Sequence, residues 1–254
     1  MLKKHIPLNY RLLIPKSIKR KAGDIWPRLK WIGNERIFCI SLQKTGTTSV
    51  GDFFFEHGFP TARYSSNKRN RWDQLWLNGN YEAIFGSADF KKFQVFEDDP
   101  WWYPEFYKLL YHRFPGSRFV FFTRDVDAWF NSMMNHSKGQ SLGNTRLHAK
   151  LYRREIEFFD RMDNDPAFVP GKHKDKLLRL AEEADMYKAL YALRTREVTE
   201  FFRDHHPERF IHLELEDPEK WKKLARFMGM NIEPSYEAHA NSTAARENQS
   251  MTSR

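Results

Sequence analysis

Residues 36–58 read R-I-F-C-I-S-L-Q-K-T-G-T-T-S-V-G-D-F-F-F-E-H-G. Residues 37–42 are a short apolar run with charge on one side and a Lys/Thr/Gly segment on the other, which predicts a buried strand. Apolar residues then recur at helical spacing over residues 47–57, and Gly58 is a suitable C-terminal stop. We therefore expect a buried strand that turns directly into an amphipathic helix.

The segment between this strand and this helix has the properties of a phosphate-binding loop. A tight strand-to-helix turn presents several backbone N–H groups toward one point, and the helix N-terminus adds partial positive charge. Gly46 lets the backbone approach an anion closely, and Lys44 supplies a full charge. The candidate anion-binding residues are Lys44, Thr45, Gly46, Thr47, Thr48 and Ser49. The alternative is a threonine-rich helix cap without a ligand.

The order of residues in this loop points to a particular donor. In nucleoside triphosphatases the loop is G-x-x-x-x-G-K-[ST], with lysine after the second glycine. Here Lys44 precedes Gly46, and the chain resembles the sulfotransferases that use 3′-phosphoadenosine 5′-phosphosulfate (PAPS). Their 5′-phosphosulfate loop is written P-K-T/S-G-T-T. Gln43 stands where that family has proline, and Ser49 stands where many members have tryptophan.

The resemblance implies a second anchor, for the 3′-phosphate of the donor. In the family it is an arginine at the end of a later strand and a serine eight residues on. Residues 118–123 read R-F-V-F-F-T and predict a strand, after which come Arg124 and, eight residues later, Ser132. An arginine fork suits phosphate. The alternatives are a surface ion pair of Arg124 with Asp125 or Asp127, and a solvated helix serine at Ser132. The joint occurrence at this spacing favours the donor site.

The same resemblance implies in-line transfer of a sulfuryl group without a covalent intermediate and without a metal, leaving 3′,5′-bisphosphoadenosine (PAP) as the product. Charge grows on the leaving oxygen, so a cation must stand beside it. Lys44 is the candidate catalytic cation, assisted by the hydroxyls of Thr47 and Thr48.

A base is needed to take the proton of the acceptor. Related sulfotransferases carry it at the end of the strand that we predict over residues 93–96. Three carboxylates follow that strand here, and counting back from Pro100 makes Asp98 the best match for the catalytic base. If the strand persists, alternation places Asp98 on the opposite side from Glu97 and Asp99. An acidic loop that faces water is the alternative.

Strand and helix signals alternate along the rest of the chain. This predicts an α/β fold: a three-layer sandwich with a central, mainly parallel sheet flanked by helices, of the P-loop nucleotide-binding type. Ligands of such folds bind at the carboxyl ends of the strands. The further predicted elements are a helix opened by Pro104 with Phe106, Leu109, Leu110 and Arg113 on one face, a helix over 126–135, mostly helix over 143–204 with a break near 165–171, a strand over 209–215, and a helix capped by Asp217 with Pro218 in its first position.

Composition limits the organisation and the setting. The 254 residues suit one large domain, which we place at 36–240 with a helical insert at about 137–204. Residues 1–35 form a basic arm and 241–254 a flexible tail in this interpretation. The single cysteine, Cys39, cannot form an intrachain disulfide and fits a buried small side chain. No stretch approaches the ~18 apolar residues of a membrane helix and no secretory signal is evident, so we expect a cytoplasmic protein.

The acceptor is expected to be a hydroxyl or amine of a small molecule, a carbohydrate or a glycolipid, with at most peripheral membrane contact. Residues 60–92 and 135–185 lie outside the resemblance and are where acceptor contacts are expected. The main alternative is a nucleotide or small-molecule kinase with a degenerate loop, which would need ATP and magnesium. A non-catalytic nucleotide- or nucleic-acid-binding protein is a further alternative that the net charge of +9 supports. The basic residues are scattered rather than gathered in a stripe, so we expect no nucleic-acid partner.

Overall fold

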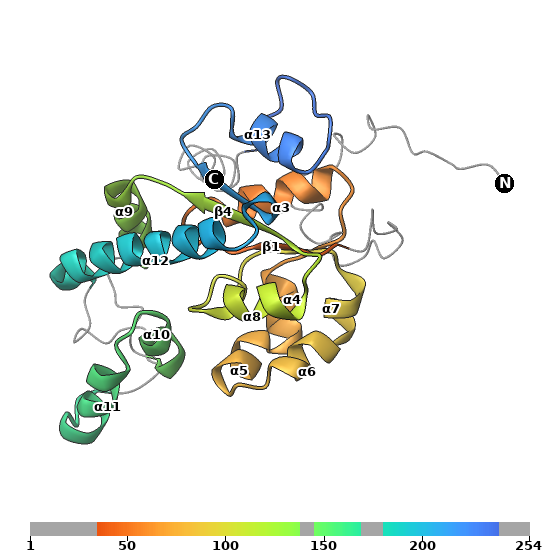
Figure 1. Cartoon of the computed structure of the whole chain (residues 1–254). Helices are drawn as coiled ribbons and strands as arrows, with labels where there is room; N and C mark the ends of the chain where they lie inside the picture. Colours follow the sequence, from red (N-terminus) through yellow and green to blue (C-terminus); the bar gives the residue numbers. More distant parts are fainter. Residues whose placement is uncertain (1–34, 138–144, 169–179, 239–254) are drawn as a thin grey trace, which may run out of the picture.

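A five-stranded sheet forms the centre of the protein in the computed structural model, which describes residues 35–137, 145–168 and 180–238. The strand order is β2-β3-β1-β4-β5, and every neighbouring pair is parallel. The strands are β1 (Ile37–Cys39), β2 (Thr61–Ala62), β3 (Val95–Phe96), β4 (Arg118–Thr123) and β5 (Phe210–Glu214). Helices lie on both faces of this sheet (Figure 1), which confirms the predicted α/β fold.

The two faces of the sheet carry different numbers of helices. Helices α3 (Thr47–Glu56) and α13 (Lys220–Phe227) cover one face, and the remaining helices lie mainly on the other side (Figure 1). The latter are α4 (Tyr64–Asn70), α5 (Trp72–Leu77), α6 (Tyr81–Gly86), α7 (Ala88–Lys92), α8 (Phe106–Arg113), α9 (Val126–Ser137), α10 (Arg146–Leu151), α11 (Glu155–Asn164) and α12 (Ala184–Asp204), with short 3₁₀ turns η2 (Leu180–Glu183) and η3 (Pro207–Arg209).

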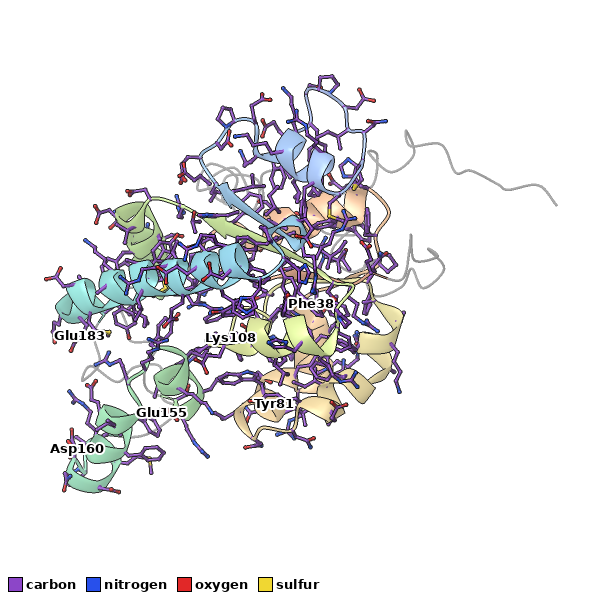
Figure 2. All side chains as sticks on the ribbon, in the orientation of Figure 1. Phe38, Tyr81, Lys108, Glu155, Asp160 and Glu183 are labelled. Carbon is purple, nitrogen blue, oxygen red and sulfur yellow. The ribbon has the colours of Figure 1, made fainter. Side chains whose placement is uncertain are left out.

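Alternation along the strands separates two hydrophobic cores. In β1, Ile37 and Cys39 belong to the core beneath α3 and α13, whereas Phe38 and the following Ile40 belong to the larger core on the other face. Phe38 is fully buried and lies among the packed side chains between the sheet and α8 (Figure 2). Burial also raises the pKa of the Cys39 thiol well above its usual range, so this cysteine is an inert core residue, as predicted.

The register of the sheet places the functional strand ends at one edge. Cys39 of β1 lies opposite Val120 of β4, and Phe38 lies opposite Phe96 of β3. Since the strands are parallel, the segments that follow β1, β3, β4 and β5 all leave at the same carboxyl edge. That edge is where the binding of ligands is expected in open α/β sheets.

Two helices begin later than predicted. Helix α8 begins at Phe106 and not at Pro104, because Glu105 adopts a left-handed conformation with φ of 58°. Helix α13 begins at Lys220 and not at Pro218. The carboxylate of Asp217 accepts a hydrogen bond from the backbone N–H of residue 219 at 2.8 Å, which makes a local turn ahead of the helix.

The buried face of α8 also differs from the prediction. Leu109 is 36% exposed, whereas Tyr107 and Tyr111 are buried. Both tyrosine rings pack against Phe201 and Phe202 of α12, with centroid distances between 5.3 and 6.0 Å. The contact with α12, a helix distant in sequence, therefore rotates the buried face of α8 away from the one that periodicity indicated.

The chain between β4 and β5 is mostly helical where the structure describes it, as predicted for residues 143–204, with short non-helical stretches between the helices. The predicted break near 165–171 lies partly outside the described residues. Residues 1–34 of the predicted arm and the whole predicted tail lie entirely outside them. Of the helices in the described ranges, none has the length and apolar character needed to cross a membrane.

Candidate active site

The loop between β1 and α3 has a backbone that only glycine fits at one position. Lys44 and Gly46 both have positive φ, 70° and 87°, and Gly46 is the N-cap of α3. A Cβ at Gly46 would stand 2.6 Å from Cδ1 of Leu215, the residue that follows β5. The left-handed backbone and the close approach of Leu215 therefore both require glycine here.

The N-terminus of α3 follows this turn directly. The backbone N–H of Val50 makes the first hydrogen bond of the helix, to the carbonyl of Gly46 at 3.1 Å. The N–H groups of Thr47, Thr48 and Ser49 precede it and lie at the positive end of the helix dipole. Gly46 has no side chain that could cap the helix, and a helix N-terminus of this kind can bind an anion.

Thr45 has a different position from the other loop residues. Its side chain is fully buried, and its hydroxyl donates to the carbonyl of Leu42 at 2.6 Å. The residue therefore stabilises the shape of the loop from inside, and the structure turns its hydroxyl away from the expected donor site.

Arg124 lies beside the loop, as the pairing of the two predicted anchors requires. It follows β4, and its Nη1 donates to the carbonyl of Lys44 at 3.4 Å. Its Nε lies 3.3 Å from Oε1 of Glu216, a carboxylate that is half exposed. Two segments 80 residues apart thus bring their cations to one edge of the sheet.

The acidic residues after Arg124 have other partners. Asp125 accepts a hydrogen bond from the backbone N–H of Ala128 at 2.8 Å and so caps the start of α9, and Asp127 pairs with Lys188 at 2.6 Å. Arg124 therefore forms an ion pair, as the alternative interpretation expected, but its partner is Glu216 and neither of these two aspartates. Ser132 is partly buried on α9 and, among the described residues, makes no hydrogen bond to Arg124.

Two aromatic side chains, Trp129 and Tyr191, hold the backbone of the loop and of Arg124 in place. The indole N–H of Trp129 on α9 donates to the carbonyl of Gln43 at 3.0 Å. The hydroxyl of Tyr191 on α12 accepts from the backbone N–H of Arg124 at 2.9 Å and donates to its carbonyl at 3.0 Å. The two rings pack together with centroids 4.5 Å apart. Trp129 lies within the stretch that resembles sulfotransferases, but no local pattern distinguished Tyr191 from other helix residues.

Gln43 connects the loop to the helical insert. Its side-chain amide donates to the hydroxyl of Tyr152, next to the end of α10, and lies 3.7 Å from the sulfur of Met133 on α9. A residue that departs from the family pattern thus makes contacts that the usual proline could not make.

The three carboxylates after β3 point to different surroundings. The strand ends at Phe96 and Asp98 has φ of 71°, so the strand does not persist and its alternation does not apply to these three residues. Glu97 is buried against α3, where its Cγ would be 2.8 Å from a Cβ added at Gly51. Asp99 turns the other way and accepts from the indole N–H of Trp102 at 2.7 Å. A turn, and not the strand pleat, separates Asp98 from its neighbours.

The charge of Lys44 influences the pKa of Asp98. Burial raises the pKa of Asp98, and the hydrogen bond from the backbone N–H of Asp99 at 3.0 Å and the charge of Lys44 both act against that rise. Burial, followed by the charge of Asp98, raises the pKa of Asp99 to about 8. This edge of the sheet therefore combines an acid with a raised pKa and the cation of the loop.

Within the described parts of the chain, no group of three or more His, Cys, Asp or Glu side chains is arranged to hold a metal ion. The site instead combines a helix N-terminus, two cations and a carboxylate. These are elements that bind an anionic group and transfer it.

A comparison with protein families agrees with this arrangement. A family model described as a sulfotransferase domain matches residues 36–245, which is most of the chain and includes every strand of the sheet. The chain therefore belongs to the sulfotransferase domain family, and the protein is a sulfotransferase. A comparison with curated proteins finds no match.

Proposed function

We propose that this sulfotransferase takes a sulfuryl group from PAPS and transfers it in line to a hydroxyl or amine of an acceptor, without a covalent intermediate. The observation that carries the proposal is the juxtaposition of Arg124 with the loop, through the hydrogen bond to the carbonyl of Lys44. Two anion anchors from separate strand ends suit a nucleotide that carries a 5′-phosphosulfate and a 3′-phosphate.

The loop would hold the 5′-phosphosulfate. The N–H groups and hydroxyls of Thr47, Thr48 and Ser49 surround the N-terminus of α3, where negative charge is favoured. Lys44 would stand beside the oxygen that joins sulfur to phosphate. Negative charge develops on that oxygen as its bond to sulfur breaks, so a cation held there stabilises the transition state more than the ground state.

Arg124 and Ser132 would hold the 3′-phosphate. Arg124 is now paired with the half-exposed carboxylate of Glu216 at 3.3 Å, a contact of modest strength. A phosphate oxygen pair fits the guanidinium fork better than a single carboxylate oxygen does, so the donor would displace Glu216. Tyr191 holds the backbone of Arg124 on both sides, which keeps the fork in place during this exchange.

Asp98 would act as the base. The acceptor oxygen attacks sulfur, the bond from sulfur to the phosphate oxygen breaks, PAP leaves, and the acceptor proton passes to the carboxylate of Asp98. Its raised pKa brings its basicity toward that needed near neutral pH. The bound acceptor would lie between this carboxylate and the loop. No metal takes part in this mechanism, and we place the reaction in the cytoplasm.

A binding titration tests the donor assignment. Calorimetry with PAP, run beside AMP and ATP–Mg²⁺, should show selective binding of the bisphosphate. Lys44→Ala and Arg124→Ala should each weaken PAP binding by roughly 10- to 100-fold, because each removes a charge-assisted contact. Arg203→Ala is the matched control, since Arg203 is 69% exposed and pairs only with its neighbour Asp204 among the described residues.

A preference for ATP–Mg²⁺ over PAP would contradict the proposal and favour a kinase. Equal binding of PAP and AMP, unaffected by Arg124→Ala, would show that the 3′-phosphate has no anchor here.

A further inference from the structure

A partly open hollow lies next to the proposed reaction centre. Six of the residues that line it carry the argument: Leu42, Trp102, Leu151, Tyr152, Leu190 and Arg194. Leu42 immediately precedes the loop, the indole of Trp102 donates to Asp99, and the hydroxyl of Tyr152 is bonded to Gln43. One end of the hollow therefore borders both the loop and the carboxylate turn.

Arg194 brings a buried cation to this apolar wall. The residue is only 6% exposed, and its guanidinium lies over the ring of Tyr107 at 4.5 Å. Its Nη2 donates to the carbonyl of Trp102 at 3.2 Å. Within the described parts of the chain, its Nη1 is buried without a hydrogen-bond partner. A buried donor without a partner is costly, and a ligand oxygen in the hollow would remove that cost.

Charge as well as hydrogen bonding favours an anion there. Burial lowers the pKa of Arg194 to about 10, so the side chain is still cationic at neutral pH. The carboxylate of Glu197 is bound by Arg153 at 2.8 and 3.0 Å, and Arg153 also lines the hollow. Arg194 forms no ion pair with any of the residues that the structure describes. The hollow therefore offers positive charge within apolar walls.

We propose that this hollow binds the acceptor, and that the acceptor is an aromatic or aliphatic alcohol that carries a carboxylate, with the carboxylate on Arg194 and the hydroxyl toward Asp98. This inference rests on the proposed function. The apolar wall of Leu42, Leu151 and Leu190 suits the hydrocarbon body of such a molecule. The unpaired Nη1 of Arg194 suits a carboxylate oxygen, which forms a charge-assisted hydrogen bond with a guanidinium.

Matched pairs of acceptors test the proposal on the unmodified protein. A panel of hydroxyaryl and hydroxyalkyl carboxylates, beginning with 3-(4-hydroxyphenyl)propionate, is titrated into the PAP-saturated enzyme beside the corresponding carboxamides. We expect each carboxylate that binds to do so roughly tenfold or more tightly than its amide, as for a hydrogen bond to a charged group.

Equal affinities, or no binding by any member of the panel while PAP still binds, would overturn this acceptor class and leave the donor assignment standing. Failure of PAP itself to bind would overturn the proposed function instead, so the two failures are distinguishable.

Variants then assign the preference to Arg194. Arg194→Met keeps the volume but removes the cation, and the ratio of affinities for acid and amide should fall to about one, with PAP affinity unchanged. Arg203→Met, an exposed position on the same helix, should preserve the ratio. Leu190→Trp narrows the hollow and should weaken acid and amide alike. Retention of the carboxylate preference in Arg194→Met, or unaltered binding in Leu190→Trp, would contradict the proposal.

Discussion

The donor side and the acceptor side of this site are constructed differently. The proposed donor contacts come from segments that directly follow β1 and β4, and most of them are backbone N–H groups or residues in a short motif. The proposed acceptor hollow is lined by side chains from α10, α12 and the turn after β3, which have no motif in common. The comparison teaches that a fixed ligand is recognised by local backbone geometry, whereas a variable ligand is recognised by what distant helices bring together.

The two sides meet at the aromatic pair Trp129 and Tyr191. Trp129 holds the loop and Tyr191 holds the end of β4, but Tyr191 lies on α12, the helix that also supplies Leu190 and Arg194 to the hollow. Movement of α12 would therefore disturb both sides, and substitutions can show how far the two are independent.

The largest expected effect is on turnover and comes from Asp98, the proposed base between the donor loop and the acceptor hollow. Asp98→Asn should lower kcat by about 100- to 10 000-fold because it removes the base, while PAP affinity stays unchanged. Since burial raises the pKa of Asp98, the rate of the unmodified enzyme should rise with pH until this carboxyl is ionised. Single-turnover conversion of PAPS to PAP, with an acceptor that the unmodified enzyme uses, measures both. Asp99→Asn is the neighbouring control, and a greater loss there would move the base to Asp99.

The next largest effect is expected from adding a side chain at Gly46 in the loop between β1 and α3, and it concerns both stability and PAP binding. Gly46→Ala should destabilise the fold by about 1–3 kcal/mol and abolish PAP binding, because its φ of 87° is strained for alanine and the added Cβ meets Leu215. Gly79→Ala is the matched control, since Gly79 also has positive φ, 71°, but open space around it. Chemical denaturation and PAP titration measure the difference. If the two variants lose equal stability, contact with Leu215 has no part in the requirement for glycine.

A smaller effect on stability and PAP affinity is expected at Tyr191, which holds the backbone of Arg124 on the donor side. Tyr191→Phe removes the hydroxyl that bonds both backbone groups of Arg124, and should lower the unfolding free energy by about 1–2 kcal/mol. PAP affinity should fall several-fold, more than the affinity for acceptors, because Arg124 loses its fixed position. Tyr81→Phe, on the edge of the main core, is the control. An equal loss of donor and acceptor affinity would show that α12 moves as a unit.

The last expected effect is on the pH dependence of stability, at Asp99. The folded-state pKa of about 8 lies above the value of ~3.9 in an unfolded chain, so the folded protein binds more protons between these values. The unfolding free energy should therefore fall as pH rises from about 4 through about 8. Asp99→Asn should reduce this fall and be more stable than the unmodified protein above pH 8. Thermal melts across that range test it, and parallel curves for the two proteins would contradict the raised pKa.

Local sequence predicted an element correctly where the residues of that element alone determine its conformation. The strand over residues 118–123 is as predicted, since a run of Phe and Val buried on both faces of the sheet has no competing conformation. Prediction failed where a second element intervenes, as at α8, whose buried face is set by α12. It failed again after Phe96, because the chain turns at Asp98 where alternation assumed an extended strand.

By itself, the sequence predicted most of the strands and helices outside residues 59–92, a phosphate-binding character for residues 43–49, and the candidacy of Arg124 and Asp98, because these depend on residues adjacent in the chain. It predicted neither β2 nor helices α4 to α7. Only the tertiary structure decided that Arg124 reaches the carbonyl of Lys44, that Thr45 turns inward, and that Arg194 is buried beside a hollow. The contacts of Arg124 and Arg194 depend on the packing of segments that are 80 and 92 residues apart in sequence. Periodicity and motifs carry no information about that packing, since they describe one element at a time.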